Sequence, residues 1–187
     1  MPIVPVHDLT IHPRENDLVI ATYGRALWVG DMQPLRELSA ELLAQPVHMF
    51  EIKPATRYDF GTQGMNYALG GDKYLRVPNE PEGIIVNLWL QAGSPSPVHI
   101  TVADSAGAVS RQVTADVHQR LNRIVIPFVA PGGRGRGGGG GGAPVGGGRA
   151  GAGIASTGVA ITPGRYTVTL DVGGTQISKP AVVRPRR

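Results

Sequence analysis

Three short stretches with β-strand character, separated by tight turns, occupy residues 6–31 and limit what the chain can fold into. Leu9 and Ile11 alternate with polar neighbours, which is the period of a strand. Residues 18–21 form a nearly continuous apolar run, as in a strand covered on both faces. Gly24 can adopt a positive φ in the turn before the third stretch. Because an isolated three-stranded meander is marginally stable, this segment needs other strands to pack against.

A connector is predicted after these strands, over residues 32–78. Pro34 suits the first position of a helix and Ser39 suits a helix N-cap, so one or two helical turns are expected. Residues 47–52 look extended. Residues 54–78 are rich in Gly, Tyr and Asn, and we expect a loop there with room for one edge strand.

Evenly spaced strands are expected over residues 79–187, where apolar side chains alternate at 84–90, 98–102, 124–128 and 166–172. Gly173-Gly174 between two strands predicts a two-residue hairpin that pairs Val172 with Thr175 and Leu170 with Ile177. About six short strands separated by turn signals are typical of a small immunoglobulin-like β-sandwich.

A glycine-rich insert interrupts this segment. Of the 22 residues from 132 to 153, 14 are glycine. Glycine loses the most entropy on ordering and has no side chain to bury, so we expect residues 131–158 to form a disordered loop. The entropy of closing a loop grows slowly with length, so a sandwich can carry the insert.

The positive charge of the chain, a net +4, lies mostly outside the expected folded parts. Six of the 18 basic residues lie in two segments without acidic residues. They are Arg134, Arg136, Arg149, Arg184, Arg186 and Arg187. The rest of the chain is mildly acidic, which argues against a nucleic-acid face on a folded domain.

The chain has no cysteine, which excludes disulfides and thiolate metal sites. It has no apolar run long enough to span a bilayer and shows no signal peptide. If Met1 is the true start, a cytoplasmic location is expected.

The N-terminal strands resemble the last blade of bacterial sortilin-like, BNR-repeat β-propeller proteins, large secreted proteins often labelled glycosyl hydrolases. The matching stretches are VHDL at 6–9, IHP at 11–13, DLVI at 17–20 and TYGRALWVGD at 22–31. Two positions depart from the family pattern, which usually has His at Tyr23 and Gly at Ala26. The resemblance implies a terminal propeller-blade fragment over residues 1–31, with the other blades outside this sequence.

The resemblance continues into the C-terminal Ig-like domain of those proteins. It covers NEPEGI at 79–84, VHITVADSAG at 98–107, LNR at 121–123 and PGRYTV at 163–168. It leaves out residues 55–75 and the insert. It implies an all-β protein made of a partial blade, a connector with a short helix (32–78) and an Ig-like β-sandwich (79–187). It also implies an extracellular or periplasmic location.

Metal-binding and catalytic interpretations of the sequence are weak. The five histidines lack the helical spacing of a zinc hydrolase, and structural or surface roles are favoured; they are His7, His12, His48, His99 and His118. Asp8, Asp17 and Asp31 are candidates for a glycosidase carboxylate pair. Each falls at a strand end or turn, where capping of backbone amides is the favoured role. No catalytic residue, metal or cofactor is predicted.

Two segments allow a binding interpretation as well as a structural one. Arg134-Gly135-Arg136-Gly137 resembles RNA-binding RGG segments, but no aromatic residue lies between 132 and 158 to stack on bases, so a flexible loop is favoured. A sugar-stacking platform is the second candidate, made of Trp28, Trp89, Tyr23, Tyr67 and Tyr74. The favoured alternative has Trp28 and Trp89 filling the interface between blade and sandwich.

The sequence thus favours a non-catalytic C-terminal structural or interaction module. Its expected partners are the missing propeller blades or another protein, with carbohydrate as a further candidate through Trp28, Trp89 and Tyr23. Nucleic acid is not an expected partner. Two alternatives stay open: a part of a glycoside-acting enzyme, or a stand-alone carbohydrate- or protein-binding module.

Overall fold

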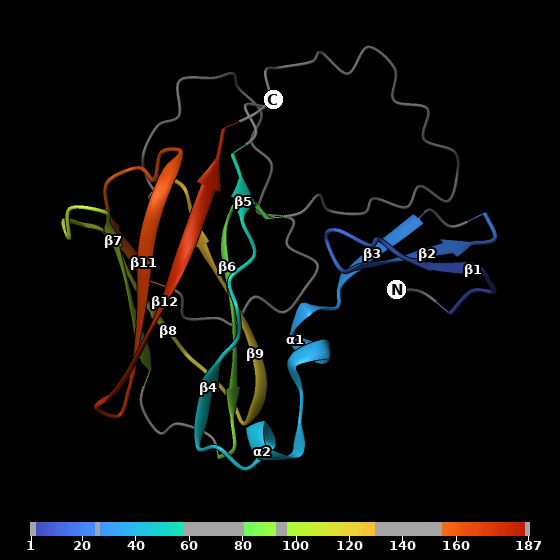
Figure 1. Ribbon diagram of the computed structural model, residues 1–187, viewed down its shortest axis with the longest axis horizontal. Helices are drawn as coiled ribbons and strands as arrows, with labels where there is room; N and C mark the ends of the chain where they lie inside the picture. The colour runs from blue at the N-terminus through green and yellow to red at the C-terminus, as the bar shows by residue number, and fades with distance from the viewer. Residues whose placement is uncertain (1–2, 25–26, 58–80, 93–96, 130–154, 186–187) are drawn as a thin grey trace.

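The protein is all-β in the computed structural model, with 58% of the described residues in strands and 7% in helices (Figure 1). The structure describes residues 3–24, 27–57, 81–92, 97–129 and 155–185. The strands form three separate sheets, and one part of the architecture is a curled, half-barrel sheet. The all-β prediction is therefore confirmed.

The first sheet is an antiparallel meander of β1 (Val6–Ile11), β2 (Asp17–Thr22) and β3 (Leu27–Asp31). Asn16 has φ +56° in the first turn and Gly24 has φ +70° in the second, as the turn residues predict. In Figure 1 this N-terminal sheet projects to one side of the remaining strands. None of its described residues is buried.

Two short helices follow, α1 (Gln33–Glu37) and α2 (Ala40–Leu43), as the sequence predicts. The hydroxyl of Ser39 accepts a hydrogen bond from the amide of Leu42 at 3.2 Å and caps α2. The chain then enters β4 (Val47–Met49) and β5 (Ala55–Thr56). These two strands join different sheets, so the segment expected to be a connector also builds the C-terminal part of the fold.

The remaining strands form two sheets that we call the body. The smaller sheet has the order β4-β6-β9 and the larger one β10-β8-β7-β11-β12-β5. The strands not yet placed are β6 (Gly83–Leu90), β7 (Val98–Asp104), β8 (Val109–Ala115), β9 (Arg120–Pro127), β10 (Ala155–Gly158), β11 (Gly164–Val172) and β12 (Thr175–Arg184).

One hydrophobic core lies between the two sheets of the body. Val86 and Leu88 of the smaller sheet and Ile100, Val168 and Leu170 of the larger one are at most 1% exposed and belong to one cluster. These residues alternate along their strands with more exposed neighbours, which is the pattern the sequence shows. No residue of β1, β2 or β3 belongs to this core.

The predicted glycine hairpin is confirmed. Val172 pairs with Thr175 and Leu170 with Ile177 in the register of β11 and β12. Gly173 has φ +57° and Gly174 has φ +88°. Two consecutive positive φ values define the type I′ turn, whose twist matches that of the flanking strands.

The range predicted as a disordered loop, 131–158, ends in a strand. Residues Ala155–Gly158 form β10 and pair with β8, whereas residues 131–154 lie outside the described part of the chain. The prediction extended too far because Ser156 and Thr157 are compatible with a strand, and because Gly158 can approach the neighbouring backbone closely. A Cβ at Gly158 would lie 2.3 Å from the carbonyl oxygen of Ser110.

A buried arginine joins the two chain segments that flank the insert. Arg111 is 0% exposed, and its Nη2 donates to the carbonyl oxygens of Phe128 at 3.0 Å and Val159 at 2.7 Å. Ile161 also donates its amide to Phe128 at 2.8 Å. Burial lowers the pKa of Arg111. The sheet is thus closed across the base of the insert by hydrogen bonds.

Gly83 offers a test of the contact between β6 and β9. A Cβ at this position would lie 2.3 Å from the backbone oxygen of Ile126, so we expect Gly83→Ala to lower the free energy of unfolding by roughly 2 kcal/mol. Gly164→Ala is the matched control, because its Cβ would meet Tyr166 at an ordinary 3.6 Å. Urea denaturation measures both variants, and equal stabilities would contradict the close approach.

Candidate functional site

Two aspartates lie opposite each other at the edge of the N-terminal sheet nearest the body. Asp17 of β2 pairs with Asp31 of β3 in the antiparallel register. Like charges in that position destabilise a sheet. Lys53, which follows β4, bridges them: its Nζ lies 2.7 Å from Asp17 Oδ1 and 3.4 Å from Asp31 Oδ1. One ammonium group thus relieves the repulsion and fastens the sheet to the body.

Asn16 makes a second set of contacts between the first turn and α1. Its carbonyl oxygen accepts a hydrogen bond from the amide of Met32 at 3.1 Å. Its side-chain Nδ2 donates to Gln33 Oε1 at 3.1 Å, and its Oδ1 accepts from Arg36. Together, Asn16, Asp17, Asp31, Gln33, Arg36 and Lys53 form what we call the polar joint.

The polar joint continues into the body through Glu37. Gln33 Nε2 donates to Glu37 Oε1 at 2.7 Å, and the amide of Glu51 donates to Glu37 Oε2 at 3.3 Å. The carboxylate of Glu51 in turn pairs with Lys179 of β12. A chain of polar contacts therefore links the N-terminal sheet to the larger sheet of the body.

The pKa of Lys53 reflects this environment. Partial burial of the ammonium lowers the pKa, but the hydrogen bond to Asp17 and the charge of Asp31 outweigh that effect and raise the pKa above its ordinary value of 10.5. Because the pKa is raised in the folded state, the ion pairs contribute fully below pH 10.5 as long as Asp17 and Asp31 are ionised. Their contribution is lost as the pH rises through the folded-state pKa.

The register of β1, β2 and β3 gives the sheet two different faces, because paired residues lie on the same side. One face, the Leu9 face, consists of Leu9, Ile11, Leu18, Ile20, Trp28 and Gly30. The opposite face, the Val29 face, consists of Asp8, Thr10, Asp17, Val19, Ala21, Leu27, Val29 and Asp31. Both faces carry rows of apolar side chains.

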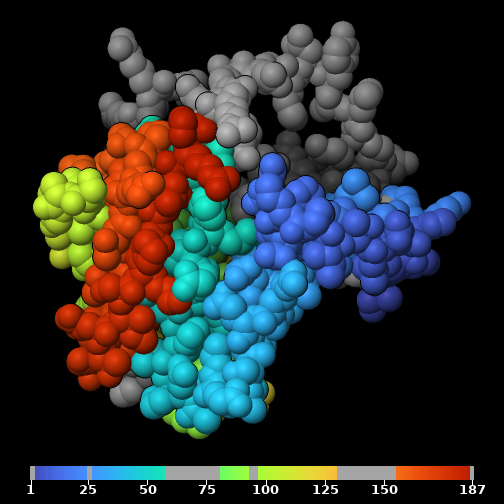
Figure 2. All heavy atoms as spheres, in the orientation of Figure 1, coloured from blue at the N-terminus to red at the C-terminus, as the bar shows by residue number. Residues whose placement is uncertain are grey.

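Each face is only partly covered: the residues of β2 and Trp28 are half-buried, and apolar side chains on β1 and β3 are exposed. Leu9 is 58% exposed on one side of the sheet, and Leu27 and Val29 are 64% and 67% exposed on the other. Figure 2 shows the N-terminal sheet projecting beside the body and the two helices. The N-terminal sheet has apolar residues on both sides and no buried residue, so its apolar surface is the one best suited to contact another β-sheet or protein.

The structure places the predicted aromatic binding residues in different surroundings. Trp28 lies on the Leu9 face of β3, and Tyr23, 73% exposed in the turn before it, stacks on His7 with ring centroids 6.0 Å apart. Trp89 lies on β6, where it pairs with His48 of β4 and with Leu121 of β9. Tyr67 and Tyr74 fall outside the described residues.

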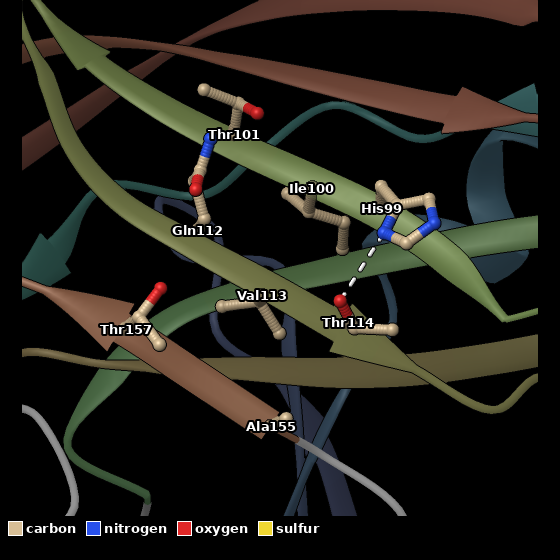
Figure 3. A pocket seen from close by; sticks show the side chains of 8 residues that line it. All are labelled: His99, Ile100, Thr101, Gln112, Val113, Thr114, Ala155 and Thr157. Atoms are coloured by element: carbon tan, nitrogen blue, oxygen red, sulfur yellow. Dashed lines mark hydrogen bonds between the residues drawn. The ribbon is translucent and has the colours of Figure 1, made fainter.

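A polar groove lies on the outer side of the larger sheet, over β7, β8 and β10 (Figure 3). His99 and Thr114 stand opposite each other there, with His99 Nδ1 3.2 Å from Thr114 Oγ1. Thr101, Gln112 and Thr157 complete its polar lining. None of the Trp and Tyr candidates lines this groove, and the ring in its lining is the imidazole of His99.

The histidines and acidic residues do not converge. In the described part of the chain, no three His, Asp or Glu residues are placed to hold a metal ion. His12 Nδ1 accepts from the amide of Glu15, and the amide of His118 donates to Asn122, so both help to form turns. Burial lowers the pKa of His48, with Lys179 adding to the effect. Arg134 and Arg136 lie outside the described residues.

The sequence pattern did not point to the polar joint. In the sequence, Asp17 and Asp31 are recognisable only as strand-end residues; the register of β2 and β3 places them opposite each other. Lys53 lies 36 residues from Asp17, and nothing in its local sequence marks it as their partner. The sequence feature that could have indicated the joint is the pair of carboxylates at adjacent strand ends, because their mutual repulsion requires a nearby cation.

Comparison with protein-family models, with curated proteins and with solved structures finds no match to this chain. Among the described residues, no helix is long and apolar enough to cross a membrane. The N-terminal sheet and the polar joint are therefore the features that indicate a function.

Lys53→Met tests the polar joint. It leaves Asp17 and Asp31 opposed without a cation, so we expect the N-terminal sheet to lose about 1 kcal/mol of local stability. Hydrogen exchange of the β2 and β3 amides measures this loss. Lys179→Met is the matched control, because Lys179 contacts neither aspartate and reaches the N-terminal sheet only through Glu51, Glu37 and Gln33, so its effect on β2 and β3 should be smaller. Equal effects of the two variants on β2 and β3 would argue against the joint.

Proposed function

We propose that this chain is a non-catalytic structural and interaction module, in which the N-terminal sheet is an inner layer of a larger stack of β-sheets. The sequence resemblance suggests that this stack is a β-propeller of the sortilin-like, BNR-repeat kind. In this proposal the body is an Ig-like brace that holds the last blade in place. An extracellular or periplasmic location is part of the same proposal.

The observation that carries the proposal is that both faces of the N-terminal sheet are apolar and that none of its described residues is buried. A sheet at the surface of a protein keeps one face polar, whereas a sheet between two layers is apolar on both. Leu9, Ile20 and Trp28 form one row on the first side, and Val19 and Val29 form one on the second. Blades of a propeller are stacked around a central axis, which supplies a neighbouring sheet on each side.

The polar joint supports a bracing role. It fastens one end of the N-terminal sheet to the body through Lys53 and Asn16, and leaves apolar side chains of the outer strands, Leu9, Leu27 and Val29, exposed. If the N-terminal sheet served only to complete the hydrophobic core, its apolar side chains would pack against the body. Instead, polar contacts position the sheet, and its apolar side chains stay outside the core, where a neighbouring sheet can contact them.

The two alternatives have less support in the geometry. For a glycoside-acting enzyme, the candidate carboxylates Asp17 and Asp31 are paired across two strands, and both are bound to Lys53. For a carbohydrate-binding module, Trp28 and Tyr23 lie on or beside the N-terminal sheet, whereas Trp89 lies on the smaller sheet of the body. The groove on the larger sheet is lined by polar and aliphatic groups and His99, without a Trp or Tyr side chain.

Hydrogen exchange on the dilute, monomeric chain tests the proposal. We expect amides of β6, β9 and β11 to exchange only through global unfolding, because these strands enclose the core. Amides of β1, β2 and β3 should exchange through local openings of much lower free energy. If the N-terminal sheet were as strongly protected as β6 in the monomer, it would not need covering layers and the proposal would fail.

A further inference from the structure

The polar groove on the outer side of the larger sheet has an ordered lining (Figure 3). The register places two rows of side chains across β10, β8 and β7. The first row is Thr157, Gln112 and Thr101, and the second is Ala155, Thr114 and His99. Side chains two residues apart on one face of a strand are separated by about 7 Å. The two rows line a groove with a volume of about 250 Å³.

The polar side chains of this lining have hydrogen-bonding groups to spare. Those of Thr101, Gln112 and Thr157 make no hydrogen bond with the rest of the described chain. His99 is held at Nδ1 by Thr114 Oγ1 at 3.2 Å, which fixes the ring and leaves Nε2 for another molecule. A hydroxyl and a carboxamide each both donate and accept. The groove therefore presents donors and acceptors side by side.

The groove is also uncharged. Among the described residues that line it, none is Lys, Arg, Asp or Glu. Asp171 stands beside His99 in the register, but it lies outside the lining and accepts hydrogen bonds from Gly174 and Gln176. A charged ligand would lose hydration here without meeting an opposite charge. An apolar ligand would cover polar groups without pairing them. A neutral ligand with several hydroxyl groups avoids both costs.

An extended peptide backbone also donates and accepts, but sheets bind it at an unpaired strand edge. The centre of the groove lies over β7 and β8, which both have a neighbour on each side: β7 lies between β8 and β11, and β8 lies between β10 and β7. Their backbone groups are used within the sheet, so recognition has to come from side chains. Side chains on adjacent strands have fixed spacings, which suits hydroxyl groups arranged around a ring.

We propose that this groove binds one ring of a small, neutral, polyhydroxylated ligand of the sugar class. Thr101, Gln112 and Thr157 hydrogen-bond its hydroxyl groups, and the imidazole of His99 bounds the groove at β7. Because the lining has no Trp or Tyr side chain, hydrogen bonds supply the affinity, and we expect a dissociation constant of about 1–20 mM. The site lies on the body and uses no residue of the N-terminal sheet, so it is independent of the proposed function.

An NMR titration of the full chain tests this site. The probes are D-glucose, D-galactose, D-mannose and N-acetyl-D-glucosamine, each added to about 50 mM. At least one of them should shift the signals of His99, Gln112 and Thr157 along a saturating curve. If every probe leaves these signals unchanged, or shifts them linearly without saturation, the proposal is overturned.

Three conservative variants assign the binding to the groove. Thr101→Val and Gln112→Leu remove hydrogen-bonding groups but keep side chains of similar size, and each should weaken binding about fivefold. Thr167→Val is the matched control, because Thr167 is exposed on the same face of the sheet, on β11, outside the lining. It should bind like the unmodified chain. The same spectra show whether each variant is folded. Unchanged affinity in folded Thr101→Val and Gln112→Leu would contradict the assignment.

Discussion

A sheet of three strands that is apolar on both sides has no way to bury its own surface, and the organisation of this protein follows from that constraint. β1, β2 and β3 contribute nothing to the core, which forms entirely between the two sheets of the body. The protein thus combines two kinds of cohesion. Hydrophobic burial holds the body together, whereas ion pairs and hydrogen bonds around Lys53 and Asn16 hold the N-terminal sheet in place.

The parts of this fold that depend on neighbouring residues were predictable from the sequence. The alternation in 84–90 and 166–172, the Ser39 cap and the Gly173-Gly174 hairpin each follow from local periodicity or turn chemistry, and the structure confirms them. The parts that depend on distant contacts were not predictable. β4 and β5 join separate sheets, and Lys53 meets Asp17, because of tertiary packing that no local pattern records.

Two cations, Lys53 and Arg111, show different ways of accommodating a charge away from solvent. Lys53 keeps its charge by contacting two carboxylates, and its pKa rises. Arg111 is fully buried and contacts two backbone carbonyl oxygens instead, and its pKa falls. The contacts of Lys53 fix the orientation of the N-terminal sheet. The contacts of Arg111 hold Phe128 and Val159 side by side, which explains why a bulky cation occupies an otherwise apolar sheet face.

The Arg111 contacts also have a consequence for how the chain can change over time. Phe128 and Val159 are held to the same guanidinium, and β10 pairs with β8 just before Val159, so the stretch between Phe128 and β10 begins and ends at fixed points of the body. Doubling the length of such a segment costs only about 0.6 kcal/mol of closure entropy. Sequence can therefore be gained or lost at this point with little effect on the sheets. The base of the insert is a natural position for grafting a peptide tag or a second folded domain onto this scaffold.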